Sequence, residues 1–309
     1  MSVRIGLGGS GLPLPDPAAF WRWVDFCDET EIDSLWLSDR LVSTQASLEP
    51  MTAVAALAGR TRRIKFGMNA VVLPSRDPLV LAKECATIDY LSGGRLLPAF
   101  GVGGDAAPEW RATGRGPTGR GVQSDEMLQI MTRLWSEDHV NFQGKHYSYD
   151  DVSISPKPAQ SPLPIWIGGN SPAAIRRTAR YGTGWLGGGA QPPEQVAGVV
   201  ASIKAALAES GRQIDDDHYG ASFSFRFGGW DEPVVERAVQ ALAARFAAAD
   251  PRATMAVGDF GAVIDLAQAY RQAGVSKFVL RPIAVDAADV MAQCRRLVDE
   301  VLPIVHAWD

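Results

Sequence analysis

Eight short apolar runs alternate with longer segments of helical periodicity along this chain of 309 residues. Such alternation is typical of βα units and a parallel sheet. Eight units in succession predict a (β/α)8 TIM barrel, in the α/β class, rather than an open sheet. We therefore expect residues 1–309 to form a single barrel domain. The runs are 3–8, 34–39, 64–73, 95–103, 164–169, 184–189, 221–227 and 277–282.

Two stretches do not fit the βα repeat, and both follow the fourth strand. Residues 104–123 are rich in Gly, Pro and Arg, and residues 139–163 read as a short hairpin followed by a Pro-rich loop. They flank a helix expected near 124–136. We interpret them as an insertion region. Pro98 within the fourth run lacks a ladder donor and suggests a bulge there.

Several helices are expected to begin where a polar residue precedes a proline, since proline suits the first helical position. These pairs are Asp16-Pro17, Glu49-Pro50, Asp77-Pro78, Ser171-Pro172 and Glu232-Pro233. The first pair also decides how the opening glycines are read. Gly6, Gly8 and Gly11 match G-x-G-x-x-G, but the helix that a dinucleotide-binding fingerprint requires begins only at Pro17, after two further prolines. A Rossmann site is therefore disfavoured.

Charge and cysteine content limit the classes of partner and compartment. The formal net charge of −5 and the lack of a basic cluster argue against nucleic acid as a partner. The three cysteines, Cys27, Cys85 and Cys294, lie far apart in helical patterns, which favours buried reduced thiols and a cytoplasmic protein. No apolar segment is long enough to span a membrane, and we expect no membrane partner.

The C-terminal ends of barrel strands carry the chemistry in this architecture, and here they are rich in glycine and arginine. Glycines let a ligand approach the backbone, and Ser171 at a helix start is suited to binding an anion. Arg76, Arg226 and Arg281 add positive charge, so these ends predict a flat or bulky ligand that carries phosphate. Structural explanations stand beside this one: tight turns, simple helix capping and ion-paired arginines. Trp36, Trp166 and Trp185 are expected to pack in the core.

Other barrel chemistries fit the strand ends poorly. A metal hydrolase needs clustered histidines and carboxylates, but the four histidines are not at strand ends, so no metal site is expected. A glycosidase needs two facing carboxylates, and only Asp39 and Asp105 qualify. We find neither a G-x-S-x-G elbow nor a Schiff-base lysine. A bound cofactor is therefore expected to carry the chemistry.

Three segments resemble the bacterial luciferase-like monooxygenase superfamily: residues 34–41, 66–103 and 156–185. Within it the chain is most similar to actinobacterial oxidoreductases that use the deazaflavin coenzyme F420. The resemblance implies a barrel that binds F420, or alternatively FMN, at the strand ends and transfers a hydride to or from a small organic substrate. It also implies a homodimer, and in the deazaflavin branch a bulge with a non-prolyl cis peptide at Asn69–Ala70.

The resemblance and the strand ends together assign the candidate residues. We expect Asp39 and Arg40 to be catalytic, with Asp105 as an alternative group for proton handling, and Arg76 and Arg281 to bind substrate. Arg40 stands where the family's sugar-phosphate dehydrogenases have His, and their later acidic positions are Ala106 and Thr183 here, which argues against glucose 6-phosphate. The cofactor-binding candidates are Gly8, Asn69, Ala70, Gly103, Gly168, Gly169, Asn170, Ser171, Gly187 and Gly188, with Gly189 beside them.

Three alternatives remain open from the residues. An FMNH2- and O2-dependent monooxygenase would use the same fold. A protein that binds a flavin or deazaflavin without catalysis would need no acid–base pair. A metal-free lyase or isomerase for phosphorylated substrates would use the anion site without any flavin. For Asp39 and Arg40, a structural ion pair is the alternative to a catalytic role.

Overall fold

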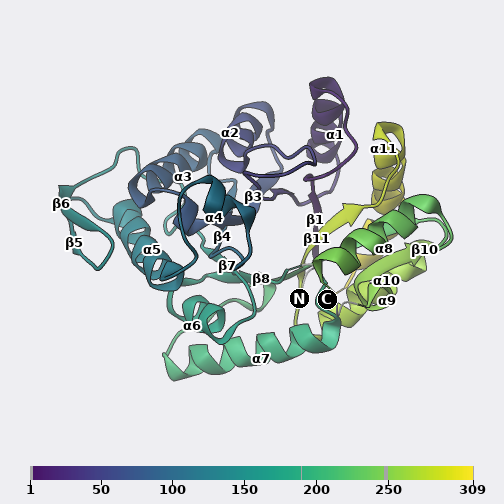
Figure 1. Ribbon diagram of the computed structural model, residues 1–309. Coiled ribbons are helices and arrows are strands. Elements are labelled where there is room, and N and C mark those ends of the chain that lie inside the picture. The colour runs from purple at the N-terminus through teal and green to yellow at the C-terminus, as the bar shows by residue number, and fades with distance from the viewer. Residues whose placement is uncertain (1–2, 189, 247–249, 309) are drawn as a thin grey trace.

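Eight parallel strands form a closed ring in the computed structural model, which describes residues 3–188, 190–246 and 250–308 (Figure 1). The ring strands are β1 (Arg4–Gly8), β2 (Ser34–Leu37), β3 (Lys65–Val72), β4 (Leu96–Gly101), β7 (Trp166–Gly168), β8 (Gly184–Leu186), β9 (Tyr219–Phe227) and β11 (Lys277–Pro282). Their order around the ring follows the chain, and the pairing of β11 with β1 closes it. The predicted (β/α)8 barrel is confirmed, and each of the eight apolar runs corresponds to one strand, although β9 begins before its run, at Tyr219.

A further strand, β10 (Met255–Gly258), was not predicted. It pairs in parallel with residues Ser224 to Phe227 at the end of β9 and is an addition to the ring. Four residues are too few to show the alternation by which a strand is recognised from sequence.

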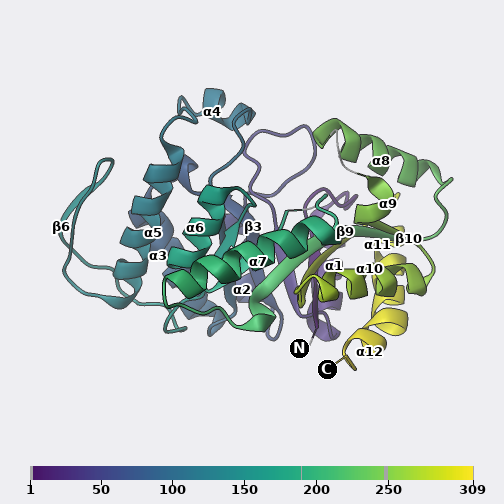
Figure 2. The ribbon, with the colours of Figure 1, turned by 90° about the horizontal axis from the view of Figure 1, so that it is seen from below.

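Helices surround the ring in both views (Figures 1 and 2). They are α1 (Pro17–Glu29), α2 (Pro50–Arg60), α3 (Pro78–Ser92), α4 (Pro108–Ala112), α5 (Arg120–Ser136), α6 (Pro172–Tyr181), α7 (Pro193–Glu209), α8 (Pro233–Arg245), α9 (Pro251–Thr254), α10 (Phe260–Gln272), α11 (Ala287–Arg296) and α12 (Leu302–Val305). Two short 3-10 helices, η1 (Leu73–Ser75) and η2 (Asp216–His218), and a π-helical segment, η3 (Leu297–Val301), complete the set. Figure 2 shows α4 and α8 at one end of the barrel and α12 at the other.

All five predicted helix starts are confirmed, and four of the five polar residues act as caps. The side chains of Asp16, Glu49, Asp77 and Ser171 accept hydrogen bonds from N–H groups in the first turn. These bonds satisfy donors that the helix itself leaves unpaired. Glu232 differs, because its carboxylate turns toward an arginine instead.

The insertion after the fourth strand is also confirmed. It comprises α4, α5 and an antiparallel hairpin of β5 (Val140–Gln143) and β6 (Ser148–Val152), which projects from the barrel beside α5 (Figure 1).

A bulge lies next to Pro98, but in the neighbouring strand. The pairing shifts between Met68–Pro98 and Val71–Phe100, so two residues of β3 stand opposite Ala99 alone.

The core has an inner and an outer part, as alternation along the strands requires. Trp36, Ala99, Trp166, Leu186 and Val279 come from five different strands and pack together inside the ring. The larger cluster, which holds most other strand and helix side chains, lies between the ring and its helices. All three predicted tryptophans are buried, although Trp185 belongs to this outer cluster.

The three cysteines are buried and free, as predicted. Burial, the first of several influences on each, raises the pKa of all three thiols, which keeps them protonated and unreactive. None of the helices in the described residues combines the length and apolar character needed to cross a bilayer.

Candidate active site

Very small residues form a layer inside the C-terminal end of the barrel, which we call the floor. Side chains alternate along a strand, so the residue two positions beyond each member of the inner cluster again points into the ring. Those positions are the small residues Ser38, Gly101, Gly168 and Gly188, together with Arg281 at the edge of the layer. Gly8, which ends β1, joins them beside Arg281. A (β/α)8 barrel is normally filled here by a layer of bulky side chains, whereas this layer is nearly flat.

The protein's own packing does not require the glycines of this floor. A Cβ at Gly8, Gly101 or Gly168 would lie 3.6 Å or more from its nearest neighbour, and at Gly188 nothing lies within 4 Å. None of the four has a positive φ. Deeper in the barrel the opposite holds, because a Cβ at Gly67 would collide with the Leu97 carbonyl. The floor therefore has space that the fold leaves open, which suits a flat ligand.

The β3 bulge supplies the remaining edge of the floor. The Asn69–Ala70 peptide bond is cis, as the family resemblance implied. The Ala70 Cβ lies 3.6 Å from the Cβ positions of both Gly101 and Gly168, so the bulge carries this methyl group over the floor. The Asn69 amide donates a 3.4 Å hydrogen bond to Ser222 across the ring. Four predicted cofactor residues, Gly8, Asn69, Ala70 and Gly168, are thus brought together with Gly188.

Asp39 does not pair with Arg40. Its side chain is only 2% exposed and accepts hydrogen bonds from the Val72 N–H at 3.0 Å and from Arg76 Nη2 at 3.1 Å. The same Arg76 nitrogen lies 2.7 Å from Glu49, the cap of α2. Burial would lower the pKa of Arg76, but the two carboxylates outweigh it and raise the pKa. Arg76 therefore joins three segments of the rim, and its predicted substrate role remains a prediction.

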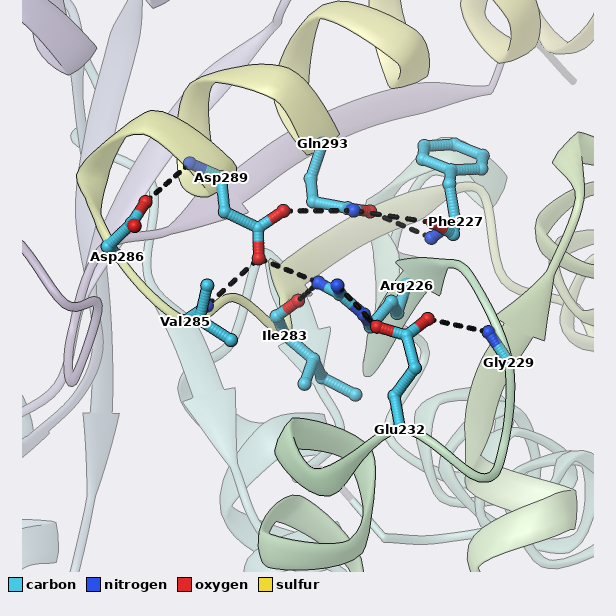
Figure 3. A network of polar contacts seen from close by, with 9 residues as sticks. All are labelled: Arg226, Phe227, Gly229, Glu232, Ile283, Val285, Asp286, Asp289 and Gln293. Atoms are coloured by element: carbon cyan, nitrogen blue, oxygen red, sulfur yellow. Dashed lines mark hydrogen bonds and ion pairs between the residues drawn. The ribbon is translucent and has the colours of Figure 1, made fainter.

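Arg226 is likewise neutralised, and Figure 3 shows its surroundings. It is 9% exposed, and its guanidinium pairs with Glu232 at 2.6 Å and Asp289 at 2.8 Å. It also donates a 2.9 Å hydrogen bond to the Ile283 carbonyl. Gln293 extends the network by accepting the Phe227 N–H at 2.7 Å. The network ties the end of β9 to α8 and α11, so the structural explanation, an ion-paired arginine, holds for Arg226.

The loop from Gly169 to Ser171 leads into α6 and is exposed. The Ser171 hydroxyl accepts a 3.2 Å hydrogen bond from the Ala174 N–H and so caps the helix. Gly169 has φ +109°, and its carbonyl accepts the Trp185 indole N–H at 2.8 Å. The loop is open to an anion at the helix N-terminus. The Asn170 and Ser171 assignments remain predictions.

Two predicted glycines have a packing explanation of their own. A Cβ at Gly103 would lie 2.7 Å from Trp110, and one at Gly187 would lie 2.8 Å from Trp185. Tight packing therefore accounts for glycine at both positions. Gly189 lies outside the described residues. Asp105 is 87% exposed and pairs with Arg120 in the insertion, and its role in proton handling remains a prediction.

The alternation rule identifies floor residues that motif reading missed. Ser38 and Gly101 follow from it directly, because Trp36 and Ala99 point inward. Thr183, by contrast, does not lie at the floor. It precedes β8 at the N-terminal end of the barrel, where its hydroxyl accepts the Ile165 N–H at 2.8 Å. The departure from the family at this position therefore carries no information about the substrate.

The opposite end of the barrel holds a cavity of about 470 Å³. Asp215, Asp217 and His218 line it, and their potential ligand atoms lie within 4.8 Å of one another. The His218 Nδ1 atom lies 2.9 Å from the Thr183 carbonyl. These groups are remote from the floor and play no part in it.

Comparison with known proteins agrees with this architecture. The family model described as luciferase-like monooxygenase matches residues 2–285. An uncharacterised protein of Mycobacterium tuberculosis is 34% identical over 166 residues, 53% of this chain and 56% of the relative. An F420-dependent glucose-6-phosphate dehydrogenase of Amycolatopsis mediterranei is 31% identical over 168 residues, 52% of this chain and 50% of the relative. The match spans about half the length of these curated relatives.

Solved structures share the fold over nearly the whole chain. An F420-dependent secondary alcohol dehydrogenase in complex with an F420-acetone adduct superposes with a TM-score of 0.82 at 18% identity, covering 100% of both chains. A type II Baeyer-Villiger monooxygenase of Pseudomonas putida in complex with FMN superposes with a TM-score of 0.80 at 20% identity, covering 98% of this chain and 99% of the other.

Proposed function

The chain belongs to the luciferase-like monooxygenase family, and on that premise we propose that it is an oxidoreductase dependent on coenzyme F420. Its substrate is a small organic molecule, which gains or loses a hydride. The observation that carries the proposal is the floor of Gly8, Gly101, Gly168 and Gly188, where neither packing nor backbone conformation calls for glycine. The F420-dependent glucose-6-phosphate dehydrogenase among the relatives supports the choice of cofactor.

The floor residues fit a deazaflavin. Its flat ring would lie on the backbone of Gly8, Gly168 and Gly188 and against the Ala70 methyl group. The exposed Gly169–Ser171 loop would receive its phosphate at the N-terminus of α6. When bound, F420 supplies hydride exchange at C5 of its ring.

The protein's own residues would bind the substrate, orient it against the cofactor and exclude water from the site. Asp39 holds the Val72 N–H two residues beyond the bulge, so it positions Ala70 rather than touching substrate directly. Arg40 is exposed at the rim, and its permanent positive charge would hold an anionic or carbonyl-bearing substrate. A bound substrate and the rim loops would then separate the reacting atoms from water.

We also propose a cytoplasmic homodimer built from single-domain subunits, with no nucleic-acid partner. The three free, buried thiols suit a reducing compartment. Val80, Tyr90 and Leu91 of α3 are 55%, 58% and 66% exposed, and a second copy would cover such apolar side chains.

Cofactor titration tests the proposal. Purified protein is titrated separately with oxidised F420 and with FMN, and binding is followed by fluorescence and calorimetry. We expect micromolar binding of F420 and weak binding of FMN. The reverse preference would assign an FMN-dependent monooxygenase. Binding of neither would remove the redox proposal and favour a lyase or isomerase, whereas F420 binding without turnover over a broad substrate panel would indicate a non-catalytic carrier.

A further inference from the structure

Arg281 stands at the edge of the floor, above the end of β1. It follows Val279 by two residues on β11 and so points into the ring. Its Nε atom lies 3.7 Å from the position that a Cβ would take at Gly8. The side chain is accessible to solvent, yet burial and the like charge of Arg40 lower the pKa of its guanidinium. Arg281 thus lies at the mouth of the barrel, exposed to solvent and near the charge of Arg40.

Two further arginines approach the same edge of the floor from other elements. Arg40 follows β2, the strand next to β1. Arg245 is the last residue of α8, a helix that lies at this end of the barrel (Figure 2). Partial burial and then the charges of Arg40 and Arg281 lower the pKa of Arg245 to about 10. The three positive charges repel one another.

Within the described part of the chain, the three charges have no counter-ions of their own. Arg76 and Arg226, the other rim arginines, are each paired with two carboxylates. Among the ion pairs formed between residues 3–188, 190–246 and 250–308, none involves Arg40, Arg245 or Arg281. Mutually repelling charges that lie close together are stabilised when an anion binds between them.

The cluster lies across the barrel from the loop proposed for the cofactor phosphate. In the ring order β1, β2, β3, β4, β7, β8, β9 and β11, four steps separate β1 from β7 in either direction. Gly8 therefore faces the Gly169–Ser171 loop from the opposite side of the floor, and Arg281 lies beside it on β11, three steps from β7 on the nearer side. One anion site for the cofactor and a second for the substrate would hold the two molecules over the same floor.

We propose that Arg40, Arg245 and Arg281 form a substrate-anion site that selects a substrate carrying two negative charges on one compact group, a phosphate ester or a pair of neighbouring carboxylates. This inference rests on the proposed function for its link to turnover, but anion binding itself does not depend on the cofactor. Arginine suits both groups because its planar donors bind phosphate or carboxylate oxygens in pairs.

Calorimetric titration of the cofactor-free protein with inorganic phosphate, malonate and acetate tests the site. We expect phosphate or malonate to bind about tenfold or more tightly than acetate, and Arg40→Gln and Arg281→Gln to weaken this binding about tenfold each. The stronger of phosphate and malonate identifies the substrate group. The matched control is Arg237→Gln, which removes an exposed arginine of the same helix as Arg245 and should leave binding unchanged.

Three outcomes would overturn the proposal. The wild type binds neither dianion, or the two variants bind it as the wild type does, or the same variants lose F420 affinity about tenfold. The last result would assign the arginines to the cofactor's acidic groups. A protein that binds dianions through these arginines but binds neither F420 nor FMN would contradict the proposed function alone and leave this site intact.

Discussion

The Asp39 carboxylate and the Arg76 guanidinium form an ion pair of 3.1 Å that joins the loop after β2 to the segment after β3. The pair is nearly buried, with side chains 2% and 16% exposed. It lies next to the glycine floor without being part of it, because Asp39 also holds the Val72 N–H just beyond the bulge. Asp39 was predicted to be catalytic, with a structural ion pair as the alternative. Its contacts favour a third role, in which it positions the bulge of β3.

Replacing Asp39 by Asn should weaken both the fold and the site. Loss of charge-assisted hydrogen bonds to Arg76 and Val72 should lower the free energy of unfolding by about 1–3 kcal/mol, measured by urea denaturation. F420 affinity should fall about tenfold because the bulge loses its anchor. Glu49→Gln is the control, since it removes the other carboxylate from Arg76 but leaves the Val72 N–H bonded. Equal loss of F420 affinity in both variants would show that Asp39 acts only as a partner of Arg76.

Replacement of Ser171 by Ala and of Gly169 by Val tests the phosphate loop. Loss of the cap should cost about 1 kcal/mol of stability, and both variants should bind F420 more weakly than the wild type. Asp16→Ala removes the same kind of cap from α1 and should lower stability without affecting F420 binding. If both loop variants bind F420 like the wild type, the phosphate lies elsewhere, and Gly187 to Gly188 is the next candidate.

Stability should decline at acid pH through the Arg226 network. The hydrogen bond from Arg226 lowers the pKa of Glu232 below its ordinary value of 4.5. Burial acts to raise the pKa of Asp289, but donors from Val285, Arg226 and Gln293 lower it below 3.8. A carboxylate with a lowered pKa in the folded state stabilises the protein above its unfolded pKa, and this stabilisation is lost as the pH falls through the folded pKa.

Asp289→Asn should therefore remove stability at pH 7, by about 1–3 kcal/mol, and flatten the loss below about pH 4. Thermal or urea unfolding between pH 2 and pH 7 measures both effects. Asp299→Asn changes an exposed carboxylate and should leave the curve unchanged. An Asp289→Asn curve parallel to that of the wild type at every pH would show that Asp289 does not titrate in this range.

Local features of the sequence predicted the ring and the helix starts because each is encoded within a few residues. A buried strand needs one apolar run, and a cap needs one side chain near its own helix, as at Asp77. The Asp39–Arg76 pair spans 37 positions and joins residues that have other plausible partners. Arg245 comes near Arg40 and Arg281 only through the course of α8, which no local pattern fixes. These tertiary placements are what the sequence alone could not provide.

The glycine floor was accessible from the sequence, although motif reading found only part of it. Gly8, Gly168 and Gly188 were predicted, whereas Gly101 and Ser38 follow only once the inward residues of each strand are known. Glycine-rich motifs also led to the prediction of Gly103 and Gly187 as cofactor-binding residues. Tight packing against tryptophans explains why both positions are glycine. Glycine has several physical causes, and only the surrounding atoms distinguish them.

Replacing floor glycines by alanine should affect protein stability and cofactor binding differently. Gly188→Ala and Gly168→Ala place a methyl group where the protein has room and φ is compatible, so stability should stay within about 1 kcal/mol of the wild type or rise slightly. The same methyl group would occupy space needed by a flat ring, so F420 affinity should fall about tenfold or more. Gly184→Ala is the matched control, because its Cβ would lie 2.7 Å from Trp166 and should cost about 1–3 kcal/mol by overpacking. Urea denaturation and fluorescence titration of the three variants separate the two effects. If Gly188→Ala and Gly168→Ala bind F420 as tightly as the wild type, no ligand rests on these glycines and the ring must lie elsewhere in the barrel mouth.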